Sequence, residues 1–261
     1  MDFPLSSPIA SHFSYVPETG STNADLIADY SNLADFSVLV AGFQSAGKGR
    51  AGRSWVAPAG SSLFVSVLLK PQGLPATKFS WLPLLAGLAM TRAVQEFLAI
   101  KEVRLKWPND VLVGEQKISG VLSELVPSLS GVVIGAGLNL KQQSGELPVE
   151  TATSLAIEGA SDINADAVLA TYLGELKKLY QDFVAHGGDA VACGLRQQVM
   201  ASCSTLDRKG NNRVRAILPN EQELLGNAVG IDETGRLMIQ PQDGSELKPI
   251  AAGDIVHLRH N

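Results

Sequence analysis

The alternation of hydrophobic and polar positions predicts a chain that mixes strands and helices. Short apolar runs bounded by turn residues predict buried strands at 35–43, 62–70 and 131–140. Helical periodicity predicts helices over 20–33, 80–100 and 164–188. We expect Ser21 or Thr22 to cap the first helix, with Asp25 completing a capping box with Thr22, and Ser80 to cap the second.

Shorter β-type runs fill much of the remaining sequence. Runs at 102–107 and 111–125 predict further strands, the second broken by a turn at Gly114 and Glu115. Beyond Thr205, four short runs separated by turn residues predict a small all-β barrel, at 212–219, 223–232, 235–241 and 254–260. We therefore predict two domains, residues 1–204 and residues 205–261.

Composition narrows the functional classes. The 261 residues are 45% hydrophobic and 18% charged, as in an ordinary folded protein. The net charge of −5 argues against a general nucleic-acid binder. Cys193 and Cys203 have no metal-ligand spacing and indicate free thiols, and the N-terminus lacks a secretory layout, so we expect a cytoplasmic protein. The four scattered histidines (His12, His186, His257 and His260) predict no metal site.

The stretch AGFQSAGKGRAGRSW, residues 41–55, matches two phosphate-binding motifs incompletely. A P-loop requires Ser or Thr after its lysine, and here that position is Gly49. Both the P-loop and the dinucleotide fingerprint open directly into a helix, whereas this stretch is followed by Pro58, Gly60 and a predicted strand. We therefore exclude both motifs.

The residues of this stretch still suit an anion. Three glycines alternate with three cations, namely Gly47, Lys48, Gly49, Arg50, Gly52 and Arg53. Guanidinium groups suit phosphate and carboxylate oxygens, and a glycine loop can close when an anion arrives. A solvated basic turn explains the charges equally well. Trp55 favours the first interpretation, because a tryptophan in a loop needs a surface to pack on.

A second cluster lies at 104–125. Lys106, Trp107, Asn109 and Asp110 end one predicted strand in a turn, which a packed tryptophan alone would also explain. Lys117 follows on an otherwise aliphatic run, so it needs a partner, and we expect a ligand carboxylate.

Together these motifs resemble those of the biotin–protein ligases. The resemblance rests on GSTN, QSAGKGRAGRSW, KWPNDV, KISGVLSE and GAGLN, in the family's order between Ser21 and Asn139. It implies an α/β (α+β) fold with a class II synthetase-like mixed sheet flanked by helices, followed by a small SH3-like β-barrel. The chain departs from the family at Lys48, where arginine is common, and at Ala51. We expect the short form of the family, without the N-terminal DNA-binding domain.

The resemblance also implies a reaction and its site. Biotin and ATP would form biotinyl-5′-AMP, with Mg²⁺ on the nucleotide, and biotin would pass to a lysine of a biotin carboxyl carrier protein. We expect Arg50 and Lys117 to be catalytic, since cations must neutralise a carboxylate that meets a phosphate. Asp110 would favour the neutral form of the acceptor lysine.

The remaining assignments follow the family's motifs. The residues expected to bind biotin are Ser21, Thr22, Asn23, Gln44, Lys48, Gly49, Arg50, Lys117 and Gly120. Those expected to bind ATP are Arg50, Arg53, Trp55 and Asn139. No membrane or DNA partner is expected, and a homodimer is left open. The alternatives are a lipoate or octanoate ligase or transferase, which shares the fold, and a biotin-sensing regulator.

Overall fold

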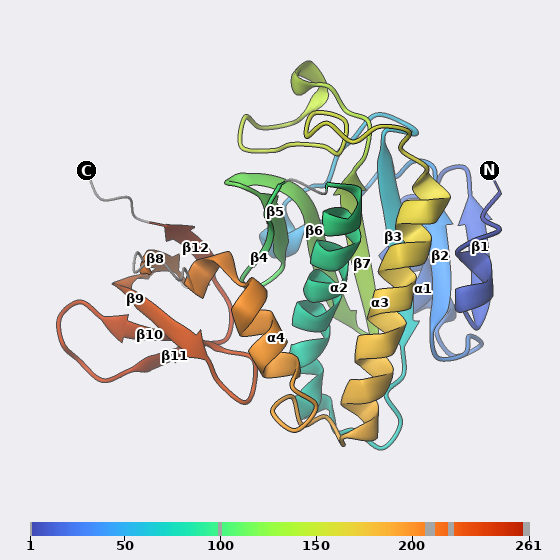
Figure 1. Cartoon of the computed structure of the whole chain (residues 1–261). Coiled ribbons are helices and arrows are strands. Elements are labelled where there is room, and N and C mark those ends of the chain that lie inside the picture. The colour runs from blue at the N-terminus through green and yellow to red at the C-terminus, as the bar shows by residue number, and fades with distance from the viewer. Residues whose placement is uncertain (1, 99–100, 207–211, 219–221, 258–261) are drawn as a thin grey trace.

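The computed structural model describes residues 2–98, 101–206, 212–218 and 222–257, which form a large and a small β-sheet (Figure 1). The large sheet has the strand order β1-β2-β3-β7-β6-β5-β4. Its strands are β1 His12–Val16, β2 Ser37–Ala41, β3 Ser62–Leu69, β4 Val103–Lys106, β5 Asp110–Val113, β6 Gln116–Leu125 and β7 Val132–Asn139. Only the β1–β2 pair is parallel, so the sheet is mixed.

Helices cover both faces of this sheet (Figure 1). The α-helices in the described ranges are α1 Thr22–Asp29, α2 Leu82–Phe97, α3 Ala165–Ala185 and α4 Leu195–Ser202. The helices α2 and α3 lie side by side on one face, and α1 lies on the other. Strand alternation in β7 sends Ile134 and Leu138 into the core with α2, while Gly135 and Gly137 face the opposite side. This second face has little side-chain bulk and leaves room for a cavity.

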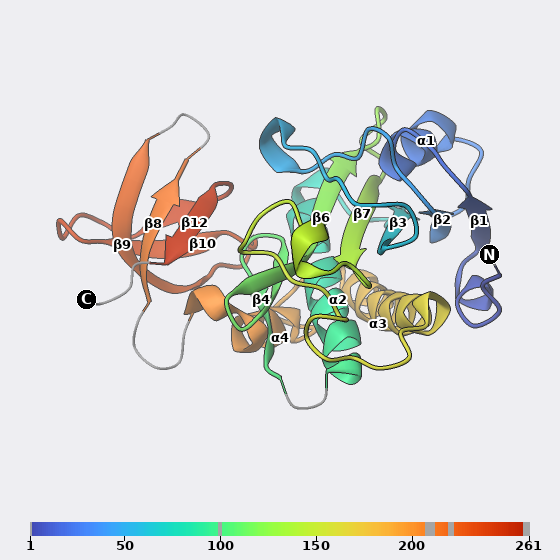
Figure 2. The same ribbon diagram turned by 90° about the horizontal axis from the view of Figure 1, so that it is seen from above.

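The small sheet is antiparallel, in the order β11-β10-β9-β8-β12, and lies beside the large one (Figure 2). Its strands are β8 Arg213–Ile217, β9 Glu223–Ile231, β10 Leu237–Pro241, β11 Lys248–Ile250 and β12 Asp254–His257. The fold class predicted from the sequence, a mixed sheet with flanking helices and a barrel-like C-terminal β-unit, is confirmed. Residues 219 and 258–260 of the predicted strands lie outside the described residues, as do residues 99–100 of the predicted second helix.

Two buried indoles attach the small sheet to the large one. Trp81 Nε1 donates to the carbonyl of Glu233 over 2.8 Å, and Trp107 Nε1 donates to the carbonyl of Gly235 over 3.0 Å. Both acceptors belong to the turn between β9 and β10. The division into residues 1–204 and 205–261 stays a prediction, and Thr205, fully buried, accepts a hydrogen bond from the backbone of Trp107.

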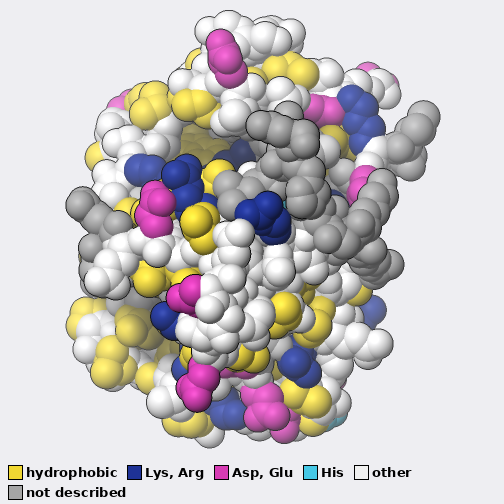
Figure 3. All heavy atoms as spheres, turned by 90° about the vertical axis from the view of Figure 1, so that its left-hand side faces the viewer, with side chains coloured by type: hydrophobic (Ala, Val, Ile, Leu, Met, Phe, Trp, Pro, Cys, Tyr) yellow, Lys and Arg dark blue, Asp and Glu magenta, His cyan; other side chains and the backbone are white. Residues whose placement is uncertain are grey.

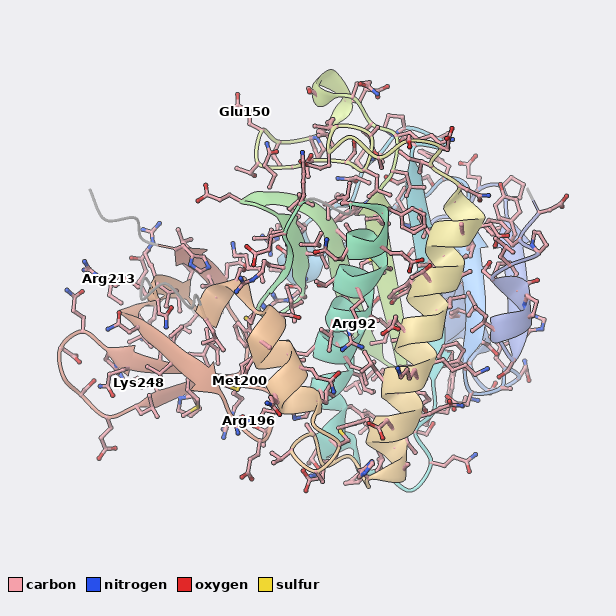
Figure 4. The ribbon with its side chains drawn as sticks, in the orientation of Figure 1. Arg92, Glu150, Arg196, Met200, Arg213 and Lys248 are labelled. Atoms are coloured by element: carbon pink, nitrogen blue, oxygen red, sulfur yellow. The ribbon has the colours of Figure 1, made fainter. Side chains whose placement is uncertain are left out.

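The helix α4 adds a further attachment. Arg196 and Met200 extend from α4 toward the small sheet (Figure 4), and Arg196 Nε donates to the carbonyl of Ile231 over 2.6 Å. Arg92 of α2 in turn donates to Glu175 of α3 and to Gln198 of α4. The three helices and the small sheet are therefore linked by polar contacts as well as by apolar packing.

The predicted helix starts need correction. Ser21 occupies the N-cap position of α1 without a side-chain cap, and no capping box forms, because the Asp25 carboxylate accepts from Thr19 instead. Ser80 caps nothing: α2 begins at Leu82 after a 3-10 turn, and the Ser80 hydroxyl donates to the carbonyl of Thr234. The Asp25 carboxylate is thus used by a residue just before the helix, and the Ser80 hydroxyl by a residue distant in sequence.

Within the part of the chain that the structure describes, every helix is too short or too polar to cross a membrane.

We predict that Trp81→Phe lowers the free energy of unfolding by about 1–3 kcal/mol, because phenylalanine removes the donor to the Glu233 carbonyl and leaves a gap where a fully buried indole was packed. Urea unfolding followed by circular dichroism measures the change. Trp55→Phe is the matched control, since Trp55 Nε1 has no hydrogen-bond partner among the described residues. Equal stability of Trp81→Phe and the unmodified protein would contradict this account of how the small sheet is held.

Candidate active site

A cavity of about 660 Å³ lies on the face of the large sheet that carries α1. Its floor consists of β3, β5, β6 and β7, and its walls are the start of α1, the loop 45–56 and the segment 148–152. We call residues 45–56 the flap. The volume suits a small organic molecule. Figure 3 shows Lys and Arg side chains beside a hollow with a hydrophobic wall.

The structure brings every residue that we assigned to a catalytic, biotin-binding or ATP-binding role to this one cavity. They are Ser21, Thr22, Asn23, Gln44, Lys48, Gly49, Arg50, Arg53, Trp55, Asp110, Lys117, Gly120 and Asn139. They come from separate segments that only the fold makes neighbours. Which ligand atoms each of them contacts stays a prediction.

One end of the cavity is polar and uncharged. Gln44 Oε1 accepts from the backbone nitrogen of Thr22 over 2.8 Å, and it lies 3.0 Å from the Thr22 hydroxyl. This leaves the Gln44 amide nitrogen without a partner among the residues described, and therefore free to donate. The buried hydroxyl of Ser21 lines the same end. Such a site suits a neutral ligand with its own donors and acceptors.

The flap is a tight hairpin. Lys48 and Ser54 form an antiparallel bridge, and Trp55 N donates to the carbonyl of Gly47 over 2.9 Å. At its tip, Ala51 has φ +53° and Gly52 has φ +72°, both in the left-handed region. The chain continues from the flap to β3 and not into a helix, so the exclusion of both phosphate-loop motifs agrees with the structure.

Trp55 packs on the floor of the cavity. A Cβ added at Gly137 would lie 2.6 Å from Trp55 Cε2, and one added at Gly120 would lie 3.0 Å from Trp55 Cζ3. Only glycine at these two facing positions of β6 and β7 lets the indole lie so close. The Lys117 ammonium lies 5.5 Å from the ring centroid, within cation–π range.

Positive charge dominates the cavity. The cationic side chains that line it are Lys48, Arg50, Arg53, Lys106 and Lys117, and the acidic ones are Asp110 and Glu115. Walls with an excess of one sign concentrate ligands of the opposite sign. The cavity therefore favours anions at this end, in contrast to the neutral end at Gln44.

Burial and neighbouring charges tune two of these cations. Burial lowers the pKa of Arg50, and the nearby carboxylates of Asp254 and Asp110 partly oppose that shift. Burial also lowers the pKa of Lys106, which Asp110 opposes and Lys117 reinforces. Both cations are incompletely hydrated, and an arriving anion would relieve the cost of burying them.

Arg50 and Lys117 each have a protein partner. Arg50 donates from a terminal guanidinium nitrogen to Asn109 Oδ1 over 2.8 Å, which draws the flap toward the start of β5. Lys117 Nζ lies 2.7 Å from Asp110 Oδ1. The sequence led us to expect a ligand carboxylate as the partner of Lys117, and the structure places Asp110 there. An ammonium has three donors, so Lys117 can hold a second carboxylate beside Asp110.

Two predicted ATP-binding residues are engaged elsewhere. Arg53 lies 2.9 Å from Asp254 Oδ1 of β12, with both side chains about half exposed, which makes a weak, solvent-screened pair. Asn139 Nδ2 donates to the carbonyl of Thr153, and Asn139 Oδ1 accepts from Gln142. Asn139 therefore fixes the segment that forms one cavity wall.

Several residues of this region had no role predicted from the sequence. Lys106 and Asn109 were part of a quoted motif, and their position beside Asp110 was the available signal. Ser66 is the single polar residue in the apolar run 63–69, which was also a signal. Asp254 carried none, because it reaches the flap only through the packing of the two sheets. No group of three or more His, Cys, Asp or Glu side chains suited to a metal occurs in the described ranges.

Comparisons with known proteins agree with this geometry. Residues 15–139 match the Biotin/lipoate A/B protein ligase family, and residues 209–258 match the Biotin protein ligase C terminal domain. The chain is 36% identical to the Biotin--[acetyl-CoA-carboxylase] ligase of Mycobacterium tuberculosis, over 94% of this chain and 88% of that one. It is 29% identical to the Bifunctional ligase/repressor BirA of Escherichia coli, over 92% of this chain and 72% of that one.

A solved structure is similar over nearly the whole chain. The biotin protein ligase from Aquifex aeolicus in complex with biotin and ATP superposes with a TM-score of 0.77 at 29% identity. The match covers 94% of this chain and 98% of that one.

We predict that Gly137→Ala displaces the Trp55 indole from the cavity floor, because the added Cβ would overlap it. Trp81 and Trp107 are fully buried, so acrylamide quenching of tryptophan fluorescence reports mainly on Trp55 and should increase. Gly174→Ala, on α3 with open space around it, is the control and should leave quenching unchanged. Unaltered quenching in Gly137→Ala would show that Trp55 does not rest on this floor.

Proposed function

The chain belongs to the biotin–protein ligases of the biotin/lipoate A/B protein ligase family, and we propose a division of the ligase reaction among its residues. It is an ATP-dependent ligase that forms biotinyl-5′-AMP from biotin and ATP and transfers biotin to a carrier protein. The observation that carries our assignment is the meeting of Arg50, from the flap, and Lys117, from β6, in one cation-rich cavity.

In the first step, the biotin carboxylate approaches the α-phosphate of ATP, and pyrophosphate leaves. Lys117 holds the carboxylate while keeping Asp110 as a second partner. Arg50 exchanges Asn109 for phosphate oxygens, for which its planar fork is suited. Cations already aimed at the reacting atoms stabilise the developing charge without further rearrangement.

The neutral end of the cavity receives the ureido ring of biotin. The free amide nitrogen of Gln44 donates to the ureido oxygen, and Ser21, Thr22 and Asn23 complete the polar surroundings. Gly49 and Gly120 leave space for the biotin ring and its aliphatic side chain. Lys48 lines the same space from the flap. A neutral polar ring held in this way cannot be replaced by a hydrocarbon end at equal affinity.

The adenylate lies nearer the flap tip. Arg53 exchanges the exposed Asp254 for phosphate, Trp55 packs against the bound molecule, and Asn139 maintains the adjoining wall. We place Mg²⁺ on the nucleotide phosphates and not in a protein cage, since hydrated Mg²⁺ commonly binds in this way. The closed flap excludes water from the acyl-adenylate, which would otherwise hydrolyse.

In the second step, a lysine amine of the carrier attacks the acyl-adenylate. A free lysine has a pKa of about 10.4 and is almost entirely protonated at neutral pH. Asp110 accepts a proton or a hydrogen bond from that amine. Once the biotin carboxylate has become an acyl group, Lys117 no longer needs to balance it and remains paired with Asp110.

The acceptor is a biotin carrier, in line with the carboxylase ligase names of the relatives, and we propose a biotin carboxyl carrier protein. We further propose residues 1–204 as the catalytic unit and residues 205–261 as an SH3-like unit, in a cytoplasmic enzyme. A homodimer would extend the large sheet at its edge strand β1, and sedimentation analysis tests whether the protein forms a dimer.

The direct test incubates the protein with biotin, Mg-ATP and a carrier domain, then measures pyrophosphate and the mass of the carrier. We expect pyrophosphate release that depends on biotin, and a carrier heavier by one biotinyl group. Lipoate in place of biotin should yield neither product. Modification with lipoate but not biotin would assign the chain to the alternative branch of the family, and pyrophosphate release without carrier modification would favour a biotin sensor.

We predict that Lys117→Met lowers the rate of pyrophosphate release by about 10²–10³-fold, because one of the two central cations is lost. Arg50→Lys keeps the charge but loses the bidentate fork, so a smaller reduction is expected. Lys101→Met, which removes a lysine paired with Glu158 outside the cavity, should leave the rate unchanged. A Lys117→Met enzyme with the unmodified rate would rule out this role.

We predict that Asp110→Asn slows transfer from preformed biotinyl-5′-AMP by about 10²–10⁴-fold at neutral pH. Raising the pH should restore the rate roughly tenfold per unit up to the pKa of the acceptor lysine, because the neutral fraction of the amine grows. Single-turnover transfer across a pH series measures both effects. If Asp110→Asn leaves transfer and adenylation at their normal rates, the assignment is wrong.

A further inference from the structure

A chain of hydrogen-bonded side chains runs from the half-buried Glu124, outside the cavity, through the buried Asn23 and Ser66 to Thr22 at the polar end of the cavity. Asn23 Nδ2 donates to Glu124 Oε2 over 2.7 Å, and the Ser66 hydroxyl donates to Asn23 Oδ1 over 2.6 Å. Ser66 Oγ also lies 2.7 Å from Thr22 Oγ1. Ser66 does not line the cavity and reaches a ligand there only through Asn23 and Thr22. Glu124 lies outside the cavity too and lines a separate hollow beside the flap.

The carboxylate fixes the direction of this chain. A carboxylate only accepts hydrogen bonds, so the amide nitrogen of Asn23 must face Glu124 and its oxygen must face Ser66. Ser66 has one hydroxyl hydrogen, which the Asn23 oxygen takes. Toward Thr22, the Ser66 oxygen can then only accept.

The direction of the hydrogen bond that the Thr22 hydroxyl donates is fixed in the same way. Its single hydroxyl hydrogen goes to Ser66, because that contact is shorter than the 3.0 Å contact to Gln44 Oε1, which already accepts from Thr22 N. The remaining lone pair of Thr22 Oγ1 can therefore only accept from a ligand. Gln44 presents its free amide nitrogen, a donor, beside it.

This end of the cavity thus offers one acceptor and one donor. That pair matches an edge of a cyclic urea, which presents an N–H beside a carbonyl oxygen. A dithiolane or a hydrocarbon end has no N–H and would leave Thr22 and Gln44 unpaired, which is costly in a buried site.

We propose that Glu124 and Ser66 are positioning residues that, through Asn23, orient Thr22 as an acceptor and so select a substrate with an N–H at this end. The inference rests on the proposed use of the cavity for biotin. Ser66 is fully buried, so water cannot replace it as a partner, and Thr22 and Asn23, at 3% and 4% exposed, meet water only from the cavity. Reversing the chain would set the Asn23 oxygen against the Glu124 carboxylate, two acceptors without a hydrogen between them.

Ser66→Ala tests the proposal in the full-length enzyme. Without the Ser66 oxygen, the Thr22 hydrogen turns to Gln44 or to the cavity, and Asn23 loses its donor. We expect the KM for biotin in pyrophosphate release to rise about tenfold, with the KM for ATP and kcat at saturating biotin changed less than twofold. Ser37→Ala is the matched control: Ser37 is a fully buried strand serine that donates to the carbonyl of Ala34, and all three parameters should stay unchanged.

Glu124→Gln tests whether the Glu124 carboxylate sets the direction of the hydrogen bonds along the chain. Glutamine has nearly the same size, but its amide can donate to Asn23, so the chain can run either way. We expect the KM for biotin to rise about threefold, in keeping with a mixture of orientations. A KM equal to that of the unmodified enzyme would overturn the role of Glu124.

Two mono-N-methyl biotins, each lacking one ureido N–H, give a readout that a merely structural role would not move. The steric cost of the methyl group is shared by the unmodified enzyme and Ser66→Ala, so it cancels in the ratio of kcat/KM values. The preference is the kcat/KM for biotin divided by the kcat/KM for the analogue. For one of the two analogues, we expect this ratio to be at least threefold smaller in Ser66→Ala than in the unmodified enzyme. Unchanged preferences for both analogues, or a Ser66→Ala enzyme with an unaltered KM for biotin, would overturn the proposal, whereas an unmodified enzyme inactive with biotin would overturn the function itself.

Discussion

A carboxylate and a triphosphate repel each other, so an enzyme that joins them must place positive charge between them before any bond forms. In this protein, the cations come from three separate elements: Arg50 from the flap, Lys106 from the end of β4 and Lys117 from β6. Burial lowers the pKa of Arg50 and of Lys106, and Asp110 partly offsets that cost in the absence of ligand. In the proposed mechanism, the substrate anions join the Asp110 carboxylate in balancing these cations.

The sheet makes this concentration of charge possible by keeping its own side chains out of the way. Gly120 and Gly137 face each other across β6 and β7, and the Trp55 indole rests on both. A Cβ on either of these two residues would collide with the indole. The cations approach from the edges of the floor. The cavity thus depends on the same alternation that sends Ile134 and Leu138 of β7 into the opposite core.

Local signals explain what the sequence could predict. The helix over 164–188 was correct because Asn164 caps α3 with its side chain, accepting from Asp166 N, and Gly187 ends it with positive φ. The residues that line the cavity could be named from the sequence because their motifs are short and contiguous. The chain of side chains from Glu124 to Thr22 could not be predicted, because Glu124 and Asn23 are 101 positions apart and meet only through tertiary packing. For the same reason Gln44, and not a local cap, satisfies the backbone of Thr22.

The account requires that Arg50 and Lys117 converge on the reacting atoms. A crystal structure with a non-hydrolysable biotinyl-adenylate analogue measures this most directly. We predict nitrogens of Arg50 and Lys117 at about 2.7–3.0 Å from the oxygens of the acyl-phosphate group. The result that would contradict the account is Arg50 still on Asn109 and Lys117 bonded to Asp110 alone, with the acyl-phosphate oxygens out of reach of both.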